Sequence, residues 1–310
     1  MTLVIAGYDY KRSLQYIWGE GEHEAKDEPK MQLCGLFVVA DSAITSHAGG
    51  RTLLNGFKKV YCLRANLWKP YFMPDGSFKD YFEIHEQREV FVAFAGSTLT
   101  AQHIINSITA HIENLRISFG RRADGSIYYS AIRHCQKNPL ITNETLYWGE
   151  DTFLPRDCDG LLTGEIISKT TECSINEALL SAGRYKLSME EFQAMRTEFV
   201  LGLWCPYQKR YELHLYRMLQ RAGADGVLVA YTDGKLLAPH EIAVLGMRAQ
   251  FEESAQKEFD DSIKNHSSPS AALNDFLKNA IDTVQQAGSK EIDHPTSFMR
   301  LSSLKIERIN

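Results

Sequence analysis

The stretch that decides our interpretation of the fold is MTLVIAGY, residues 1–8. A secretory signal peptide needs a basic segment and then an apolar segment of about seven to fifteen residues, but Asp9, Lys11 and Arg12 interrupt the apolar run here. The pattern therefore predicts a β-strand that begins at Thr2. Chain ends usually fray, and one reason to hold an end in a strand is to place its terminal amine in a functional site. The ordinary alternative is a first strand without such a role, with which many proteins begin.

The next apolar runs continue the pattern of a buried sheet. LCGLFVVA (33–40) has the length of a buried strand and is followed by DSAIT (41–45), and GFKKVYCL (56–63) leads into another strand. VFVAFA (90–95) is a further buried strand, and GST (96–98) then opens an amphipathic helix. The apolar positions of this helix have the spacing of a helix packed on a sheet, and they include Ile104, Ile105, Ile108, Ile112 and Leu115.

Composition excludes several classes of protein. With 310 residues, 44% hydrophobic and 24% charged, the chain is long enough for a large core and is unlike a disordered protein. Its net charge of −5 argues against a dominant nucleic-acid surface. The sequence has no apolar run of about 18 residues, so we expect no membrane span. The six scattered cysteines form no CxxC pair and indicate reduced, cytoplasmic thiols. The sequence contains no GxGxxG, Walker or HExxH motif, so we expect no metal and no cofactor.

Four of these segments, in their order, resemble the proteasome β-subunits and their bacterial relative HslV, which are threonine peptidases of the N-terminal nucleophile hydrolase superfamily. They are the strand from Thr2, VVADSAIT (38–45), the lysine pair before Val60, and FAGST (94–98) at the start of a helix. The resemblance implies four catalytic positions, which are Thr2, Asp41, Lys59 and Gly96. It also implies a substrate-binding group, which consists of Thr45, Phe94, Ser97 and Thr98.

The residue types suit this chemistry. A threonine hydroxyl needs a base, and in the family the base is the α-amine of the same residue, whose ordinary pKa is about 7.7–8.0. Lys59 would bias that amine toward the neutral form, Asp41 would orient Lys59, and the Gly96 N–H would donate to the oxyanion. The scheme requires removal of Met1, which the small side chain of Thr2 favours. Each residue also has an ordinary alternative role, in which Asp41 forms a turn, Lys59 is a solvated lysine and Gly96 is a turn glycine.

The second half of the sequence fits the family less closely. We predict a strand at 127–132, helices at 175–182 and 188–203, a strand at 211–216, and a hairpin-like region of 227–231 and 241–246 around Asp233-Gly234. Helices follow at 251–259 and 271–284, with a last strand at 297–301. Where the family has a serine near the nucleophile, Gly246 is followed by Met247 and Arg248. Asp282 and Ser289 are candidates for the auxiliary aspartate and serine of the family.

The resemblance implies an α+β fold, a four-layer αββα sandwich. We interpret residues 1–310 as one such domain, enlarged by insertions at 11–32, 64–88 and 137–205. The implied activity is hydrolysis of peptide bonds through an acyl-enzyme on Thr2, in a cytoplasmic homo-oligomeric ring that takes unfolded protein from a separate ATPase. Two alternatives stay open, namely a non-catalytic proteasome-like assembly subunit and an N-terminal nucleophile amidase that acts on a small amide.

Overall fold

The computed structural model describes residues 2–13, 30–45, 51–142, 148–149, 152–182, 188–222, 228–302 and 305–309. Its strands are β1 (Leu3–Ser13), β2 (Lys30–Ala40), β3 (Ile44–Thr45), β4 (Thr52–Leu54), β5 (Val60–Phe72), β6 (Phe78–Gly96), β7 (Leu115–Arg121), β8 (Ile127–Arg133), β9 (Thr197–Cys205), β10 (Arg210–Ala222), β11 (Leu228–Leu236), β12 (Ala243–Gly246), β13 (Ser297–Ser302) and β14 (Lys305–Arg308). Its helices are α1 (Thr98–Ile112), α2 (Pro139–Thr142), α3 (Pro155–Cys158), α4 (Gly164–Ala182), α5 (Met189–Met195), α6 (Arg248–Lys264) and α7 (Pro269–Gln286). The chain is thus a mixed α/β protein, which is compatible with the expected α+β class.

The first sheet has five strands in the order β12-β1-β2-β13-β14. The initial strand β1 lies inside this sheet and pairs antiparallel with both β12 and β2. Its residues from Leu3 to Ala6 are all fully buried, because both faces of the strand are covered. This explains why the sequence of β1 is continuously apolar here instead of alternating.

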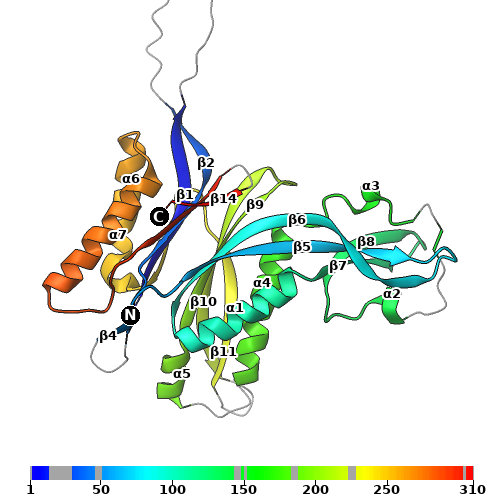
Figure 1. Cartoon of the computed structure of the whole chain (residues 1–310), viewed down its shortest axis with the longest axis horizontal. Helices are drawn as coiled ribbons and strands as arrows, with labels where there is room; N and C mark the ends of the chain where they lie inside the picture. Colours follow the sequence, from blue (N-terminus) through cyan, green and yellow to red (C-terminus); the bar gives the residue numbers. More distant parts are fainter. Residues whose placement is uncertain are drawn as a thin grey trace, which may run out of the picture.

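The second sheet has seven strands in the order β11-β10-β9-β6-β5-β7-β8. Strands β5 and β6 form a long antiparallel hairpin that extends away from the first sheet (Figure 1). The segment that was predicted to be an insertion, residues 64–88, therefore continues these two strands as a hairpin. Strand β7 runs parallel to β5 and pairs with β8.

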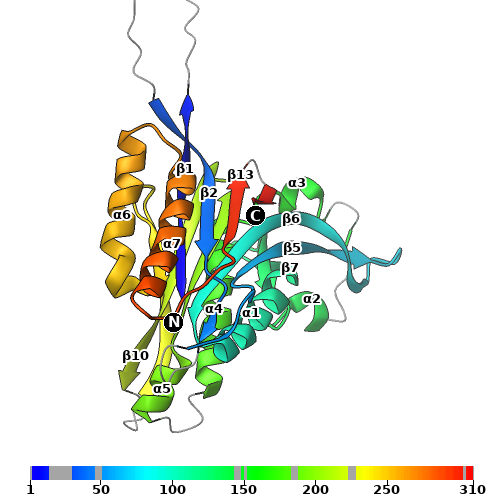
Figure 2. The same ribbon diagram turned by 60° about the vertical axis from the view of Figure 1, so that its left-hand side comes forward.

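Apolar side chains form three clusters that hold the layers together. One lies between the two sheets and joins residues such as Val38 and Leu245 to Phe91 and Val200. A second joins the other face of the five-stranded sheet to α6 and α7, which lie side by side along it (Figure 2). The third joins the other face of the seven-stranded sheet to α1 and α4. The two sheets are therefore packed against each other, with helices on their outer faces.

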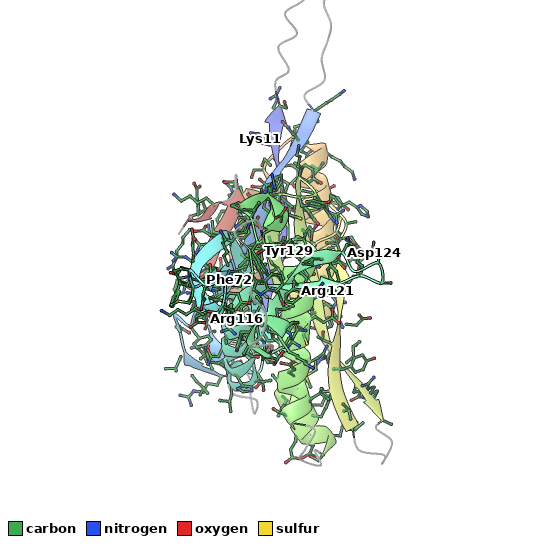
Figure 3. All side chains as sticks on the ribbon, turned by 90° about the vertical axis from the view of Figure 1, so that its right-hand side faces the viewer. Lys11, Phe72, Arg116, Arg121, Asp124 and Tyr129 are labelled. Atoms are coloured by element: carbon green, nitrogen blue, oxygen red, sulfur yellow. The ribbon has the colours of Figure 1, made fainter. Side chains whose placement is uncertain are left out.

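The far end of the β5–β8 region has its own aromatic cluster. Phe153, which is 2% exposed, contacts the rings of Phe72, Trp148 and Tyr129 at centroid distances of 5.3, 5.1 and 4.8 Å. Figure 3 looks at this end of the molecule, where Phe72 and Tyr129 are partly buried and Asp124 lies in the exposed β7–β8 turn. This cluster stabilises the projecting hairpin without contributions from the five-stranded sheet.

Several predicted elements are confirmed and extended by the structure. These are the strands expected at 33–40, 90–95, 127–132, 211–216 and 297–301 and the helices expected at 175–182, 251–259 and 271–284. The helix after Gly96 is also confirmed, but it ends at Ile112, and Leu115 begins β7. At 11–32 the described ends belong to β1 and β2, which pair up to Ser13 and Lys30; the rest lies outside the described residues.

Two predictions were wrong. The helix expected at 188–203 stops at Met195, and the following residues form β9, which lies between β10 and β6 in the seven-stranded sheet. The segment 137–205 thus contributes a central strand. The hairpin expected around Asp233-Gly234 is absent from the described residues, because both residues lie within β11, where they pair with Arg217 and Tyr216 of β10. Strand β12 instead pairs with β1, and Val227 lies outside the described residues.

No described helix is long and apolar enough to cross a membrane. The six cysteines are all free thiols, of which Cys158 and Cys205 are buried.

The inter-sheet cluster should be a main source of stability. Leu36 of β2 is fully buried in it, whereas Leu219 of β10 is 42% exposed. We expect Leu36→Ala to lower the free energy of unfolding by about 2–5 kcal/mol, because it leaves a cavity between the sheets. The matched change Leu219→Ala should cost less than about 1 kcal/mol. Urea unfolding followed by circular dichroism measures both, and equal losses would contradict the packing described above.

Candidate functional site

Thr2 lies immediately before β1, where the ends of several strands meet. The residue is only 6% exposed. Its carbonyl oxygen accepts a hydrogen bond of 2.9 Å from the Met247 N–H, just after β12. Gly246 allows this approach, because a Cβ atom there would lie 1.9 Å from the Thr2 oxygen and because its φ of +84° suits glycine. The backbone of Thr2 is therefore held in place by the neighbouring strand.

Asp41 and Lys59 meet beside the Thr2 hydroxyl. The Lys59 Nζ donates to Oδ1 and Oδ2 of Asp41 at 2.9 and 2.8 Å and to Oγ1 of Thr2 at 3.1 Å. The Asp41 carboxylate also accepts hydrogen bonds of 2.9 Å from the Leu3 and Ala43 N–H groups. Asp41 follows β2 and Lys59 precedes β5, so both sheets deliver their side chains to the start of β1.

Both members of this ion pair are almost completely buried, with side-chain exposures of 3% for Lys59 and 0% for Asp41. Burial lowers the pKa of the Lys59 ammonium below its ordinary value, an effect that the nearby Asp41 carboxylate opposes. Burial likewise raises the pKa of Asp41, against the effect of the Lys59 charge and of its hydrogen-bond donors. A lysine with a lowered pKa next to a hydroxyl is well suited to proton handling.

Gly96 ends β6 beside this group. Its φ is +116°, and a Cβ atom would lie 2.2 Å from the backbone oxygen of Arg196. Ser97 caps the helix α1 that follows: its Oγ accepts from the Thr100 N–H at 3.4 Å, and its own N–H donates to the Arg196 oxygen. The positive end of the helix dipole of α1 is thus next to Gly96, where it favours negative charge.

A cavity of about 520 Å³ opens beside Thr2. Most of the predicted site residues line it, namely Thr2, Thr45, Gly96, Ser97 and Thr98. Asp41 and Lys59 do not line it and instead contact Thr2 from the protein interior. Phe94 does not line it either, because its ring is 1% exposed and packs against Phe199 and Phe57 at 6.3 and 6.2 Å. The structure therefore assembles the predicted group except for Phe94.

The cavity also has walls that the sequence reasoning missed. These walls are Gln193 of α5, Arg196 at its C-terminal cap, Glu198 of β9, and Arg248 at the start of α6. The first three fall in the segment that was predicted to be a helix within an insertion. The run FVLGLWC after Glu198 has the length and composition of a buried strand and was the available signal.

The auxiliary candidates do not reach this site. Neither Asp282 nor Ser289 is among the described residues that line the cavity. Asp282 is exposed on α7 and lies 3.4 Å from His294 Nε2. Within the described parts of the chain, no group of three or more His, Cys, Asp or Glu side chains could hold a metal ion.

Neither protein-family models nor curated proteins give a match to this sequence.

The contributions of Asp41 and Lys59 to the free energy of unfolding should depend on each other, because the two side chains form a buried ion pair. We expect Asp41→Asn and Lys59→Met each to lower the free energy of unfolding by about 3–5 kcal/mol, because each leaves a buried charge without its partner. The double variant should lose clearly less than the sum of the two single losses. Urea unfolding of the four proteins measures this coupling, and strictly additive losses would show that the two side chains do not interact.

Proposed function

We propose that this protein is a threonine-type amide hydrolase that forms an acyl-enzyme on Thr2 and cleaves peptide bonds. The observation that carries the proposal is the contact of 3.1 Å between Lys59 Nζ and Thr2 Oγ1. The buried Asp41 carboxylate orients Lys59 for this contact, and Thr2 lies at the wall of the cavity. A hydroxyl that a buried cation holds in one position at the wall of an open cavity is well placed to act as a nucleophile once a base takes its proton.

The fold supports the same proposal. Two packed sheets with helix pairs on their outer faces agree with the four-layer αββα sandwich of N-terminal nucleophile hydrolases. Thr2, Asp41, Lys59 and Gly96 all lie next to strand ends at the same end of the packed sheets, because paired antiparallel strands start and finish side by side.

The proposed reaction begins once Met1 has been removed. The free α-amine of Thr2 takes the hydroxyl proton while Oγ1 attacks the carbonyl carbon of the substrate. The Gly96 N–H and the N-terminal end of α1 stabilise the oxyanion of the tetrahedral intermediate. The ammonium then gives its proton to the leaving amine, which leaves an ester on Thr2. Water attacks that ester with the amine as base, releases the acid and restores Thr2.

The substrate and the assembly are part of the proposal. A cavity of about 520 Å³ accommodates an amino-acid side chain or a small amide. We favour peptides, in agreement with the resemblance to proteasome β-subunits and HslV. The same resemblance would place the chain in a homo-oligomeric ring that is supplied with unfolded protein by a separate ATPase.

The central test is the Thr2 hydroxyl. We expect intact-mass spectrometry to show that Met1 is absent and that a peptide boronate or epoxyketone forms an adduct at Thr2. Thr2→Ala should lower peptide hydrolysis by at least about 10³-fold, because it removes the nucleophile, whereas Thr2→Ser should retain activity. Retention of Met1, or full activity in Thr2→Ala, would refute the proposal. Hydrolysis of small amides without hydrolysis of peptides would favour the amidase alternative.

The pH dependence should reflect the buried lysine. Because burial lowers the Lys59 pKa below 10.5, its ammonium is lost at a lower pH than that of an ordinary lysine. The rate of peptide hydrolysis should therefore fall on the alkaline side at a pH below the 10.5 of an ordinary lysine. Lys59→Arg stays charged over this range, so any activity that it retains should lack this alkaline decline. An identical alkaline decline in the arginine variant would assign it to another group.

A further inference from the structure

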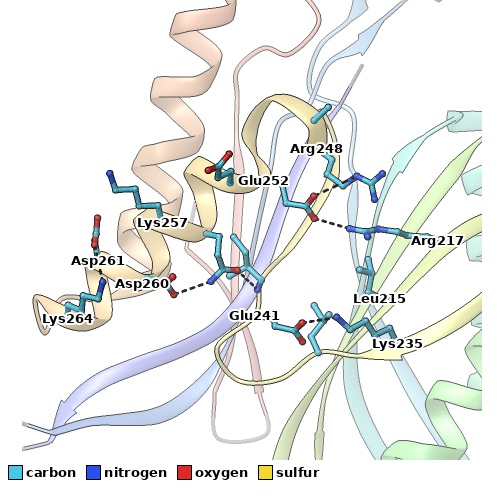
Figure 4. A pocket seen from close by; sticks show the side chains of 15 residues that line it. Leu215, Arg217, Lys235, Glu241, Arg248, Glu252, Lys257, Asp260, Asp261 and Lys264 are labelled. Carbon is cyan, nitrogen blue, oxygen red and sulfur yellow. Dashed lines mark hydrogen bonds and ion pairs between the residues drawn. The ribbon is translucent and has the colours of Figure 1, made fainter.

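A second cavity, of about 700 Å³, lies between α6 and the strands β10 and β11. Figure 4 shows its ionic side chains in contact with one another: Glu252 lies between Arg217 and Arg248, and Lys235 contacts Glu241. The described residues that line this cavity include no cysteine, histidine, serine or threonine. Its charges thus compensate one another, and none of its described side chains is a nucleophilic thiol or hydroxyl.

A cysteine and a histidine meet on the opposite side of the molecule, where α1 and α4 cover the seven-stranded sheet. Cys135 follows β8 and is exposed. Its Sγ makes a hydrogen-bond contact of 3.7 Å with Nε2 of His111, which lies in the last turn of α1. Only 12% of the His111 side chain is exposed. The thiol is therefore accessible, while the imidazole beside it is held by its surroundings.

The hydrogen bonds of His111 determine which of its ring nitrogens carries the proton. Its Nδ1 lies 2.7 Å from Oγ of Ser174, a buried residue of α4. This hydroxyl donates its one hydrogen to the carbonyl oxygen of Thr170 at 2.7 Å, because a carbonyl oxygen can only accept. Ser174 Oγ therefore accepts a hydrogen bond from the Nδ1–H group. Nε2 is left with a lone pair that faces the Cys135 thiol.

The charges around the ring suit a base that takes up a proton for a short time. Burial lowers the pKa of His111 below its ordinary value, with Glu177 opposing and Arg133 and His134 adding to the effect, so the imidazole is neutral at pH 7. Once Nε2 takes a proton, Glu177 Oε2 at 3.8 Å and the C-terminal end of α1 stabilise the positive charge. Arg133, which donates to Glu177 Oε1 at 2.6 Å, favours a negative charge on Cys135.

We propose that Cys135 is a site of covalent modification, at which its thiol reacts with low-molecular-weight disulfides. His111 Nε2 takes the thiol proton while Sγ attacks one sulfur of the disulfide, so that a new S–S bond forms and the old one breaks. The leaving half departs as a thiolate and takes the proton from Nε2. Cys135 is thereby oxidised to a mixed disulfide, and the leaving half is reduced to a thiol.

The geometry is that of an activated nucleophile, in which a third group orients the base. Cys135 supplies the nucleophile, His111 the base and Ser174 the group that orients it. None of the three lines the Thr2 cavity. The inference is therefore independent of the proposed function.

Two other thiols of the chain provide comparisons. Cys62 is also exposed, but its Sγ contacts the thioether sulfur of Met299 at 3.6 Å. Cys173 Sγ donates to the Glu177 carboxylate at 3.6 Å, and that negative charge opposes formation of a thiolate. Burial raises the pKa of both thiols above the ordinary value. We therefore expect both to react more slowly than Cys135.

The first experiment treats the reduced full-length protein with oxidised glutathione at pH 7 and follows each cysteine by peptide mass spectrometry. Cys135 should gain glutathione at least about 10-fold faster than Cys62 and Cys173, because an ordinary thiol is a thiolate only to a few per cent at this pH. Equal rates at Cys135 and Cys62 would overturn the inference.

The second experiment removes the base. His111→Asn lacks Nε2 but keeps an amide N–H for Ser174, and it should slow the reaction of Cys135 by at least about 10-fold. The same change at His103, which is exposed on the same helix, should leave the rate as in the wild type. An unchanged rate in His111→Asn, or equal slowing in His103→Asn, would overturn the inference.

If circular dichroism shows that His111→Asn does not fold, Ser174→Ala takes its place. Without the serine hydroxyl, the imidazole proton is no longer held on Nδ1, and molecules that carry it on Nε2 have no lone pair for the thiol proton. Cys135 should then react at least about twofold more slowly than in the wild type, whereas an unchanged rate would overturn the inference.

Discussion

The geometry around Thr2 depends on the hydrogen bonds and the ion pair that the buried Asp41 carboxylate makes. It accepts hydrogen bonds from the Leu3 and Ala43 N–H groups and from the Lys59 ammonium. It therefore joins the first residue of β1, the segment after β2 and the segment before β5. Because an ion pair in the interior is costly unless its members are well paired, these three segments can be displaced relative to one another only at a high energetic cost. The Thr2 hydroxyl is positioned as a consequence, since Lys59 holds it as well.

Two glycines complete this constraint on either side of Thr2. Gly246 lets β12 approach the Thr2 carbonyl, and Gly96 lets β6 approach the Arg196 backbone. Both have positive φ angles, and in both a Cβ atom would meet backbone atoms that cannot move aside. The walls of the cavity are thus fixed by backbone contacts, which position groups more precisely than flexible surface side chains do. This precision holds the Thr2 hydroxyl against its neighbours without the help of a bound molecule.

The sequence allowed part of this arrangement to be predicted, and the reasons for success and failure are physical. Strands β1, β2 and β6 contain long apolar runs because they are covered on both faces, and the residues at their ends come together because the strands pair antiparallel. Strand β9 was mistaken for helix because a short apolar run after the helix α5 has no periodicity that distinguishes the two. Asp233-Gly234 suggested a turn, yet it lies in β11 at the edge of its sheet, where an irregular composition is tolerated. Glu198 could not be found from local pattern, because its partners are in β10 and β12.

The distribution of charge in the cavity bears on what the site can select. Its acidic side chains are Glu198 and Glu291 and its basic ones are Arg196 and Arg248, so they balance, and the ion pair behind Thr2 is neutral too. A cavity without net charge gains little from long-range attraction of charged substrates. Glu198 differs from the other three because it is turned inward between the sheets, whereas Arg196 is exposed and Arg248 and Glu291 are half-buried. The outer wall of the cavity, which α5 and the start of α6 help to form, therefore presents the shape and the hydrogen-bonding groups that a bound molecule would contact.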